Sequence, residues 1–224
     1  MTAGSDSIAS TAASRLSCVR RWPSDAARRW SIQFVDDAMN NSFVDAIVAI
    51  GSAVRGTSFS ADVDFIVIFH DMAPRLPQRR VDVDLRGFRR EKVEELLTQG
   101  HELLAWAVKF GCVVFERKHY WTELCSKWQN RVPLPSATVA SERARKAERL
   151  FRQLEAAGDD DAAQEQRITM LTHRARARLI YAGVYPVSRP ELPAQLAAIG
   201  EHQLAAELAD LLKRRAAVAS GYTE

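Results

Sequence analysis

The stretch GSAVRGTSFSADVDF, Gly51 to Phe65, lies between two apolar segments and decides the fold. Residues 43–50 (FVDAIVAI) are apolar and rich in β-branched side chains, and they stop at Gly51 as a buried strand does. Residues 63–69 (VDFIVIF) are almost continuously apolar after an acidic start and predict a second buried strand. We therefore expect two strands joined by a turn rich in Gly, Ser and Thr.

This turn carries groups suited to binding an anion. Gly51 and Ser52 can open a short helix, so that their backbone N–H groups and the Ser52 hydroxyl point at phosphate oxygens. Gly56 allows the chain to turn back, and Arg55 adds a cation able to face the same oxygens. A Gly-Ser pair alone more often marks a plain strand-to-helix turn, so its meaning depends on the residues that follow.

Two carboxylates follow at the start of the second strand. Asp62 and Asp64 are separated by one residue, which places both on the same face. Mg²⁺ prefers oxygen ligands and is usually held by one or two carboxylates together with substrate phosphates. Without the upstream Gly-Ser pair, such acids would more simply cap a turn. The combination predicts a site for Mg²⁺ and a nucleoside triphosphate (NTP).

A two-metal site needs a third acid on a neighbouring strand. Residues 81–85 (VDVDL) alternate strictly between apolar and acidic, so they predict a third strand with Asp82 and Asp84 on one face. Both acids point the same way, and the alternation does not choose between them. A strand with one solvated face would show the same pattern.

A change in composition divides the chain into two parts. Strand-like and helical segments alternate up to about residue 132, whereas after Pro133 and Pro135 the β-branched runs vanish and Ala, Leu, Glu and Arg dominate. The sequence thus predicts an α+β domain followed by an all-helical bundle. The expected boundaries are 1–20 for a flexible N-terminal tail, 21–132 for the α+β domain and 138–218 for the helical domain.

Composition sets limits on partners and compartment. Hydrophobic residues make up 47% and the formal net charge is only +3, which gives a weak hint of nucleic-acid binding. Cys18, Cys112 and Cys125 are odd in number and widely spaced, so neither a disulfide nor a zinc site is expected. No segment has the roughly 20 apolar residues of a membrane span. These features favour a cytoplasmic protein without a membrane partner.

The Gly51 segment resembles the polymerase-β-type nucleotidyltransferase superfamily, in particular its minimal nucleotidyltransferases. The shared residues are Gly51-Ser52, a spacer of nine residues that contains Arg55-Gly56, and then Asp62-Val63-Asp64. Two features depart from the family pattern: Ala61 replaces a Ser that small bacterial members often carry, and the spacer is one residue shorter than is common. The resemblance covers about residues 30–120.

The resemblance implies a small mixed sheet with helices on one face. It also implies two Mg²⁺ ions held by Asp62, Asp64 and a third acid, with Ser52 and Arg55 on the β and γ phosphates. For the third acid it favours Asp84 over Asp82, because in small members this acid precedes a Phe or Ser that opens the next helix, as Phe88 does here. Asp84 would also serve as the general base.

The implied activity is transfer of a nucleoside monophosphate from an NTP donor to an acceptor hydroxyl. Among similar proteins the acceptor is an antibiotic, a protein side chain or an RNA end. The alternative is an antitoxin-like module that binds nucleotide or neutralises a toxin with little turnover. The helical domain could also make the protein a homo-oligomer.

Overall fold

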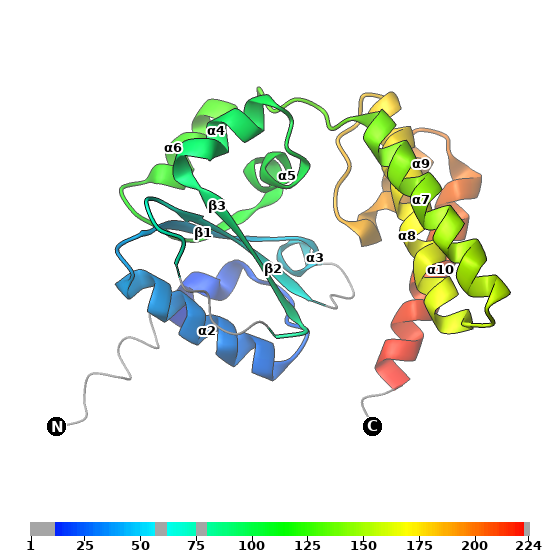
Figure 1. Cartoon of the computed structure of the whole chain (residues 1–224), viewed down its shortest axis with the longest axis horizontal. Coiled ribbons are helices and arrows are strands. Elements are labelled where there is room, and N and C mark those ends of the chain that lie inside the picture. Colours follow the sequence, from blue (N-terminus) through cyan, green and yellow to red (C-terminus); the bar gives the residue numbers. More distant parts are fainter. Residues whose placement is uncertain (1–11, 57–61, 75–79, 222–224) are drawn as a thin grey trace. The chain divides into compact units, whose positions relative to one another are not determined.

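The computed structural model describes residues 12–56, 62–74 and 80–221, and the chain divides into two compact units, residues 1–133 and 134–224. The first unit combines a four-stranded sheet with helices, and the second is helical in its described part (Figure 1). The predicted α+β class is therefore confirmed. The first unit contains η1 (Leu16–Cys18), α2 (Asp25–Asn40), β1 (Val44–Ile50), α3 (Ser52–Arg55), β2 (Val63–Phe69), β3 (Val83–Arg89), α4 (Arg90–Thr98), α5 (Glu102–Phe110), β4 (Cys112–Glu116) and α6 (Tyr120–Trp128).

The sheet has the strand order β3-β2-β1-β4. β1 pairs antiparallel with both β2 and β4, and β2 pairs parallel with β3. The second strand has the predicted bounds, but the third begins two residues later than expected and continues to Arg89. Val81 and Asp82, expected in this strand, lie in a turn before it, and Val81 is fully exposed. This pairing brings the last residues of β1 and the first residues of β2 and β3 together at one end of the sheet, where the Gly51 turn begins.

Helices cover both faces of this sheet, which corrects the expectation of helices on one face. Every residue of β1 is buried, as a strand is when both faces are packed. Figure 1 shows α2 on one side of the sheet and α4, α5 and α6 on the other. On the α2 side, Phe34 and Val35 pack in one core with Ile47 and Phe65. The sheet is therefore the middle layer of three.

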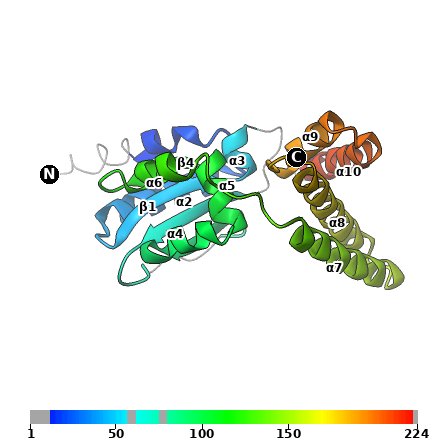
Figure 2. The same ribbon diagram turned by 90° about the horizontal axis from the view of Figure 1, so that it is seen from above.

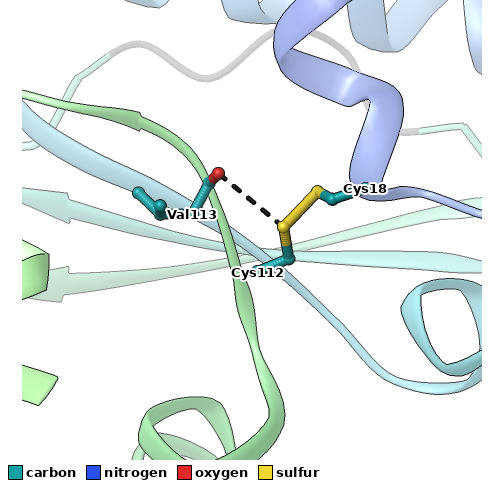
Figure 3. Close-up of a disulfide and its surroundings, with 3 residues drawn as sticks. All are labelled: Cys18, Cys112 and Val113. Carbon is teal, nitrogen blue, oxygen red and sulfur yellow. Dashed lines mark hydrogen bonds between the residues drawn. A yellow bond between two sulfur atoms is a disulfide. The ribbon is translucent and has the colours of Figure 1, made fainter.

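The segment before α2 is packed and fastened, so the expected flexible tail is wrong for residues 12–20. Ala12, Leu16 and Val19 are buried in the same core as α2 and the sheet. Cys18 forms a disulfide with Cys112 at the start of β4 (Figure 3). The remainder of the predicted tail, residues 1–11, lies outside the described residues.

The disulfide also corrects the expectation that the cysteines stay unpaired. Its two cysteines are 94 residues apart in the sequence, so no short spacing motif announces the pair. The expectation of a cytoplasmic protein rested in part on unpaired cysteines, and the disulfide removes that part of its support. Of the described helices, none is both long enough and apolar enough to cross a membrane.

Replacing both Cys18 and Cys112 by Ser is expected to lower the free energy of unfolding by about 2–4 kcal/mol, because the crosslink restricts a long loop of the unfolded chain. Urea unfolding under non-reducing conditions measures the difference. Cys125→Ser is the matched control, since Cys125 is a half-buried free thiol whose pKa burial raises to about 11. An unchanged urea midpoint in the double variant would contradict the expected stabilisation.

The second unit consists of α7 (Ala137–Ala156), α8 (Asp160–Tyr181), η2 (Arg189–Glu191), α9 (Leu192–Ala198) and α10 (His202–Gly221). α7 and α8 form a hairpin and lie side by side in both views (Figures 1 and 2). Ile168, Leu171 and Leu179 of α8 pack in one core with residues of α9 and α10. Ahead of α9, the Ser188 hydroxyl donates a hydrogen bond to the Glu191 carboxylate instead of capping the backbone of η2, so Ser188 to Glu191 does not form the capping box that its residue types suggest.

Candidate functional site

Gly51 brings the turn and the Asp64 carboxylate together. Its backbone has φ 81° and ψ −162°, a region that only glycine occupies readily. A Cβ at this position would lie 2.6 Å from Asp64 Oδ2. The close approach follows from the strand register, in which Ile50 of β1 pairs with Asp64 of β2. The carboxylate therefore lies directly against the beginning of the turn.

Asp84 stands beside Asp64 on the neighbouring strand. β2 and β3 run parallel in a register that pairs Asp64 with Asp84, and the flanking Val63 with Val83. Adjacent strands lie about 4.8 Å apart, so two side chains at paired positions on one face are close neighbours. Asp84 is also engaged by Arg86, whose Nη2 lies 2.8 Å from Asp84 Oδ2. The site thus contains two neighbouring carboxylates, and Arg86 is a basic partner of Asp84.

Asp82, the other candidate for the third acid, is hydrogen-bonded to Ser24 and Arg80. Its Oδ2 accepts a hydrogen bond of 2.6 Å from the Ser24 hydroxyl, and its Oδ1 one of 2.8 Å from Arg80 Nε. The hydrogen bond from Arg80 is the main cause that lowers the pKa of Asp82 below its ordinary value of 3.8. Ser24 in turn accepts from Ala27 N as the N-cap of α2. The Asp82 carboxylate ties β3 to the start of α2.

Asp82→Asn is therefore expected to lower stability by about 1–2 kcal/mol at pH 7, the worth of charge-assisted hydrogen bonds. A carboxylate whose folded pKa is depressed stabilises above its ordinary pKa and loses this effect as pH falls through the folded value. The difference in the free energy of unfolding between variant and wild type should consequently narrow below about pH 4. Urea unfolding at pH 7 and pH 3 measures it. A gap that is equally large at both pH values would contradict the assignment.

Asp62 lies just before β2 and is exposed. Residues 57–61, which precede it, lie outside the described part of the chain. Within the described residues, no three His, Cys, Asp or Glu side chains are grouped closely enough to hold a metal ion by themselves. Neighbouring carboxylates on two strands nonetheless fit Mg²⁺, which uses one or two protein carboxylates and takes its other ligands from phosphates and water. The protein donors present suit Mg²⁺ once substrate phosphates are added.

The other predicted phosphate-binding residues lie along α3. Ser52 is its first residue, and Gly56 ends it in the left-handed conformation with φ 69°. Arg55 has its guanidinium 5.3 Å from the centroid of the Phe110 ring on α5, a cation–π contact that the sequence did not indicate. The turn and its glycines are thus formed as expected, while Arg55 is held in part by an aromatic ring.

The structure brings two further cations to this region. Arg86 lies two residues beyond Asp84 on β3, a spacing visible in the sequence that places both on one face. Arg20 lies against Gly56, since a Cβ on that glycine would be 2.9 Å from Arg20 Cδ. Sequence reasoning missed Arg20 because it lies in the segment expected to be a flexible tail. No local pattern links it to the turn more than 30 residues later.

A separate group of charged side chains lies at the far end of β1. Asp45 is buried, and its two oxygens lie 2.9 Å from His70 Nδ1 and 3.1 Å from Arg90 Nη1. The Arg90 guanidinium in turn lies 4.5 Å from the centroid of the Tyr120 ring. Burial raises the pKa of Tyr120 to about 12. This group satisfies a buried acid and joins β1, β2, α4 and α6, so it belongs to the fold.

No protein-family model and no curated protein sequence matches the chain. Among solved structures it is similar to a nucleotidyltransferase-like protein from Exiguobacterium sibiricum 255-15, with 19% sequence identity and a TM-score of 0.32. The match covers 68% of this chain and 56% of that protein, so the chain spans just over half of its length. A likeness this distant says nothing about substrate or mechanism, and the function has to be argued from the residues of the site.

Proposed function

We propose that this protein is a Mg²⁺-dependent nucleotidyltransferase that moves a nucleoside monophosphate from an NTP to an acceptor hydroxyl. One observation carries the proposal: the Gly51 turn, the Asp64 carboxylate pressed against it and Asp84 in register beside Asp64 meet at one end of the sheet. Carboxylates beside a glycine turn that can bind phosphate supply what a metal-assisted transfer from a triphosphate requires.

In this proposal Asp62, Asp64 and Asp84 hold two Mg²⁺ ions. When bound, the ions would neutralise triphosphate charge and lower the pKa of the acceptor hydroxyl. Ser52 and Arg55 orient the β and γ phosphates, which leaves the α-phosphorus beside the carboxylates. Asp84 accepts the proton of the acceptor hydroxyl, whose oxygen bonds to the α-phosphorus while the bond from that phosphorus to the β-phosphate oxygen breaks. Pyrophosphate then leaves.

Asp84 is preferred to Asp82 as the third acid because the two carboxylates have different surroundings. Asp84 pairs with Asp64 across the strands, whereas Asp82 binds Ser24 and Arg80 on the way into β3. Using Asp82 as a ligand would disrupt three hydrogen bonds of the fold, one from Ser24 and two from Arg80. Among the described residues, the ion-pair partner that Asp84 has to give up is Arg86, whose side chain is 58% exposed.

The ion pair between Arg86 and Asp84 favours a second candidate function, a module that binds nucleotide with little turnover. In that case Arg86 permanently neutralises the carboxylate, and the domain acts as a sensor or as a partner of another protein. The two candidates make the same prediction for nucleotide binding and opposite predictions for transfer.

A labelling experiment separates them. The purified protein is incubated with Mg²⁺, cell extract and each of the four NTPs labelled at the α-phosphate, and the extract is then divided into RNA, protein and small molecules. The proposed enzyme places label in one of these fractions, which identifies the acceptor class. Nucleotide binding without label in any fraction would favour the binding module and contradict the proposed transfer.

A further inference from the structure

We propose that Arg20 is a triphosphate-binding residue, supplied to the Gly51–Gly56 turn by the segment that precedes α2. The inference rests on the proposed function and names a residue that neither the motif nor the resemblance includes. Three features support it: the segment docks on α3, Arg20 packs against Gly56, and the Arg20 guanidinium has no partner among the described residues.

The segment docks on α3 through its backbone. The N–H groups of Arg20 and Arg21 both donate to the Ala53 carbonyl oxygen, at 2.9 and 3.2 Å. Ala53 is buried in the middle of the four-residue helix that begins at Ser52. These hydrogen bonds fix the Arg20 backbone beside the turn.

Two anchors hold the segment in this place. Leu16 and Val19 are buried in the core of the first unit. The disulfide joins Cys18 to Cys112, which pairs with Ala49 of β1, two residues before Gly51 (Figure 3). The crosslink therefore connects the segment that carries Arg20 to β4, at the residue that pairs with β1 just before β1 leads into the turn. An arginine held this way loses little freedom when it binds a ligand.

The side chain of Arg20 packs against the end of the turn, and its charged group has no partner among the residues that the structure describes. A Cβ on Gly56 would lie 2.9 Å from Arg20 Cδ and 3.5 Å from Nη1, so the absence of a side chain at Gly56 makes room for this arginine. Within the described part of the chain, its guanidinium has neither a carboxylate partner nor a hydrogen bond, and Arg20 is exposed. Arginine commonly packs its stem in this way while presenting a free charge.

The position of this charge indicates the ligand group. Asp64 lies against Gly51 at one end of the turn, and Arg20 lies against Gly56 at the other. A triphosphate along the turn with its α-phosphate beside the carboxylates would extend its β and γ phosphates towards the other end. A guanidinium donates paired hydrogen bonds to phosphate, which suits Arg20 to these terminal phosphates.

Binding of magnesium pyrophosphate tests the inference without requiring turnover or knowledge of the base. Arg20→Met keeps the packed stem and removes the charge, and it should weaken pyrophosphate binding about tenfold, as expected for loss of a charge-assisted contact. Arg20→Lys should recover part of the affinity. Binding of the four nucleoside monophosphates, which lack the β and γ phosphates, should stay unchanged in both variants. Isothermal titration calorimetry gives the dissociation constants.

The control is Arg15→Met, which removes the same charge from the same segment at a guanidinium that lies 5.9 Å from the Phe115 ring. Its pyrophosphate affinity should equal that of the wild type. If Arg20→Met binds pyrophosphate as tightly as the wild type, the role of Arg20 is overturned while the proposed function stands. If the wild type binds neither pyrophosphate nor any NTP, the proposed function fails, and the Arg20 inference fails with it.

Discussion

Asp64→Asn is expected to lower nucleotidyl transfer by at least about 100-fold, the loss typical when a group that stabilises transition-state charge is removed. The physical reason is local. The amide keeps the shape of the side chain beside Gly51 but loses the negative charge that a divalent cation needs. Label transfer from an α-labelled NTP at saturating Mg²⁺ measures the rate, and urea unfolding shows that the variant is folded.

Asp71→Asn is the matched control for this substitution. Asp71 is an exposed residue after β2, and asparagine tolerates its left-handed backbone, φ 54°. The Asp71→Asn substitution changes the net charge by the same amount as Asp64→Asn but away from the site, so transfer should continue at the wild-type rate. Equal rates for Asp64→Asn and the wild type would remove Asp64 from the catalytic site.

Gly51→Ala is expected to damage both the fold and the site. The backbone at Gly51 costs about 1–3 kcal/mol for any residue with a Cβ. The new methyl group would also meet Asp64 Oδ2 at 2.6 Å, so the carboxylate has to move. A misplacement of about 1 Å at a reacting centre can cost about 100-fold in rate. Thermal unfolding and label transfer measure the two effects separately.

Gly100→Ala distinguishes the effect of backbone strain from the effect of moving the Asp64 carboxylate. Gly100 also has a positive φ, 74°, but its nearest neighbour would be Pro133 Cγ at 3.6 Å, an ordinary contact. This variant should lose stability and keep its transfer rate. If Gly51→Ala also keeps the wild-type rate, the contact between Gly51 and Asp64 has no role in catalysis.

Features encoded by neighbouring residues were predictable from the sequence. The bounds of β2 follow from a run of apolar, mostly β-branched residues, and Ser24 is a residue type that commonly caps a helix, as it does for α2. The Gly51 turn and α3 also form where the residues predict them. Within these elements, short-range propensity and burial point to the same structure.

Features that depend on distant partners were not predictable. The start of β3 is shifted because Asp82 is engaged by Ser24, 58 residues earlier in the chain. The alternation of residues 81–85 carries no trace of that contact. Cys18 and Cys112 are likewise joined only by the fold, and Arg20 reaches Gly56 because that disulfide and the buried Leu16 fix its segment. For the candidate site, the sequence indicates the acids and the turn, whereas their neighbours come from the tertiary structure.

The choice between Asp82 and Asp84 illustrates the same limit. Both acids fit an alternating strand, and only the pairing of β2 with β3 sets Asp84 beside Asp64. The competing contacts of Asp82 come from Arg80 and from Ser24 at the start of α2, a helix that precedes the sheet in the sequence. A pattern of period two specifies a face, but it does not specify which neighbours that face meets.

The position of the label in the products tests the central claim most directly. The protein is incubated with Mg²⁺, the acceptor fraction identified in extract and one NTP labelled at either the α or the γ phosphate. Transfer of a nucleoside monophosphate predicts that the α label enters the acceptor while the γ label leaves as pyrophosphate. Both outcomes should be lost in Asp64→Asn. Entry of the γ label into the acceptor, or α-label transfer that persists in Asp64→Asn, would contradict the proposal.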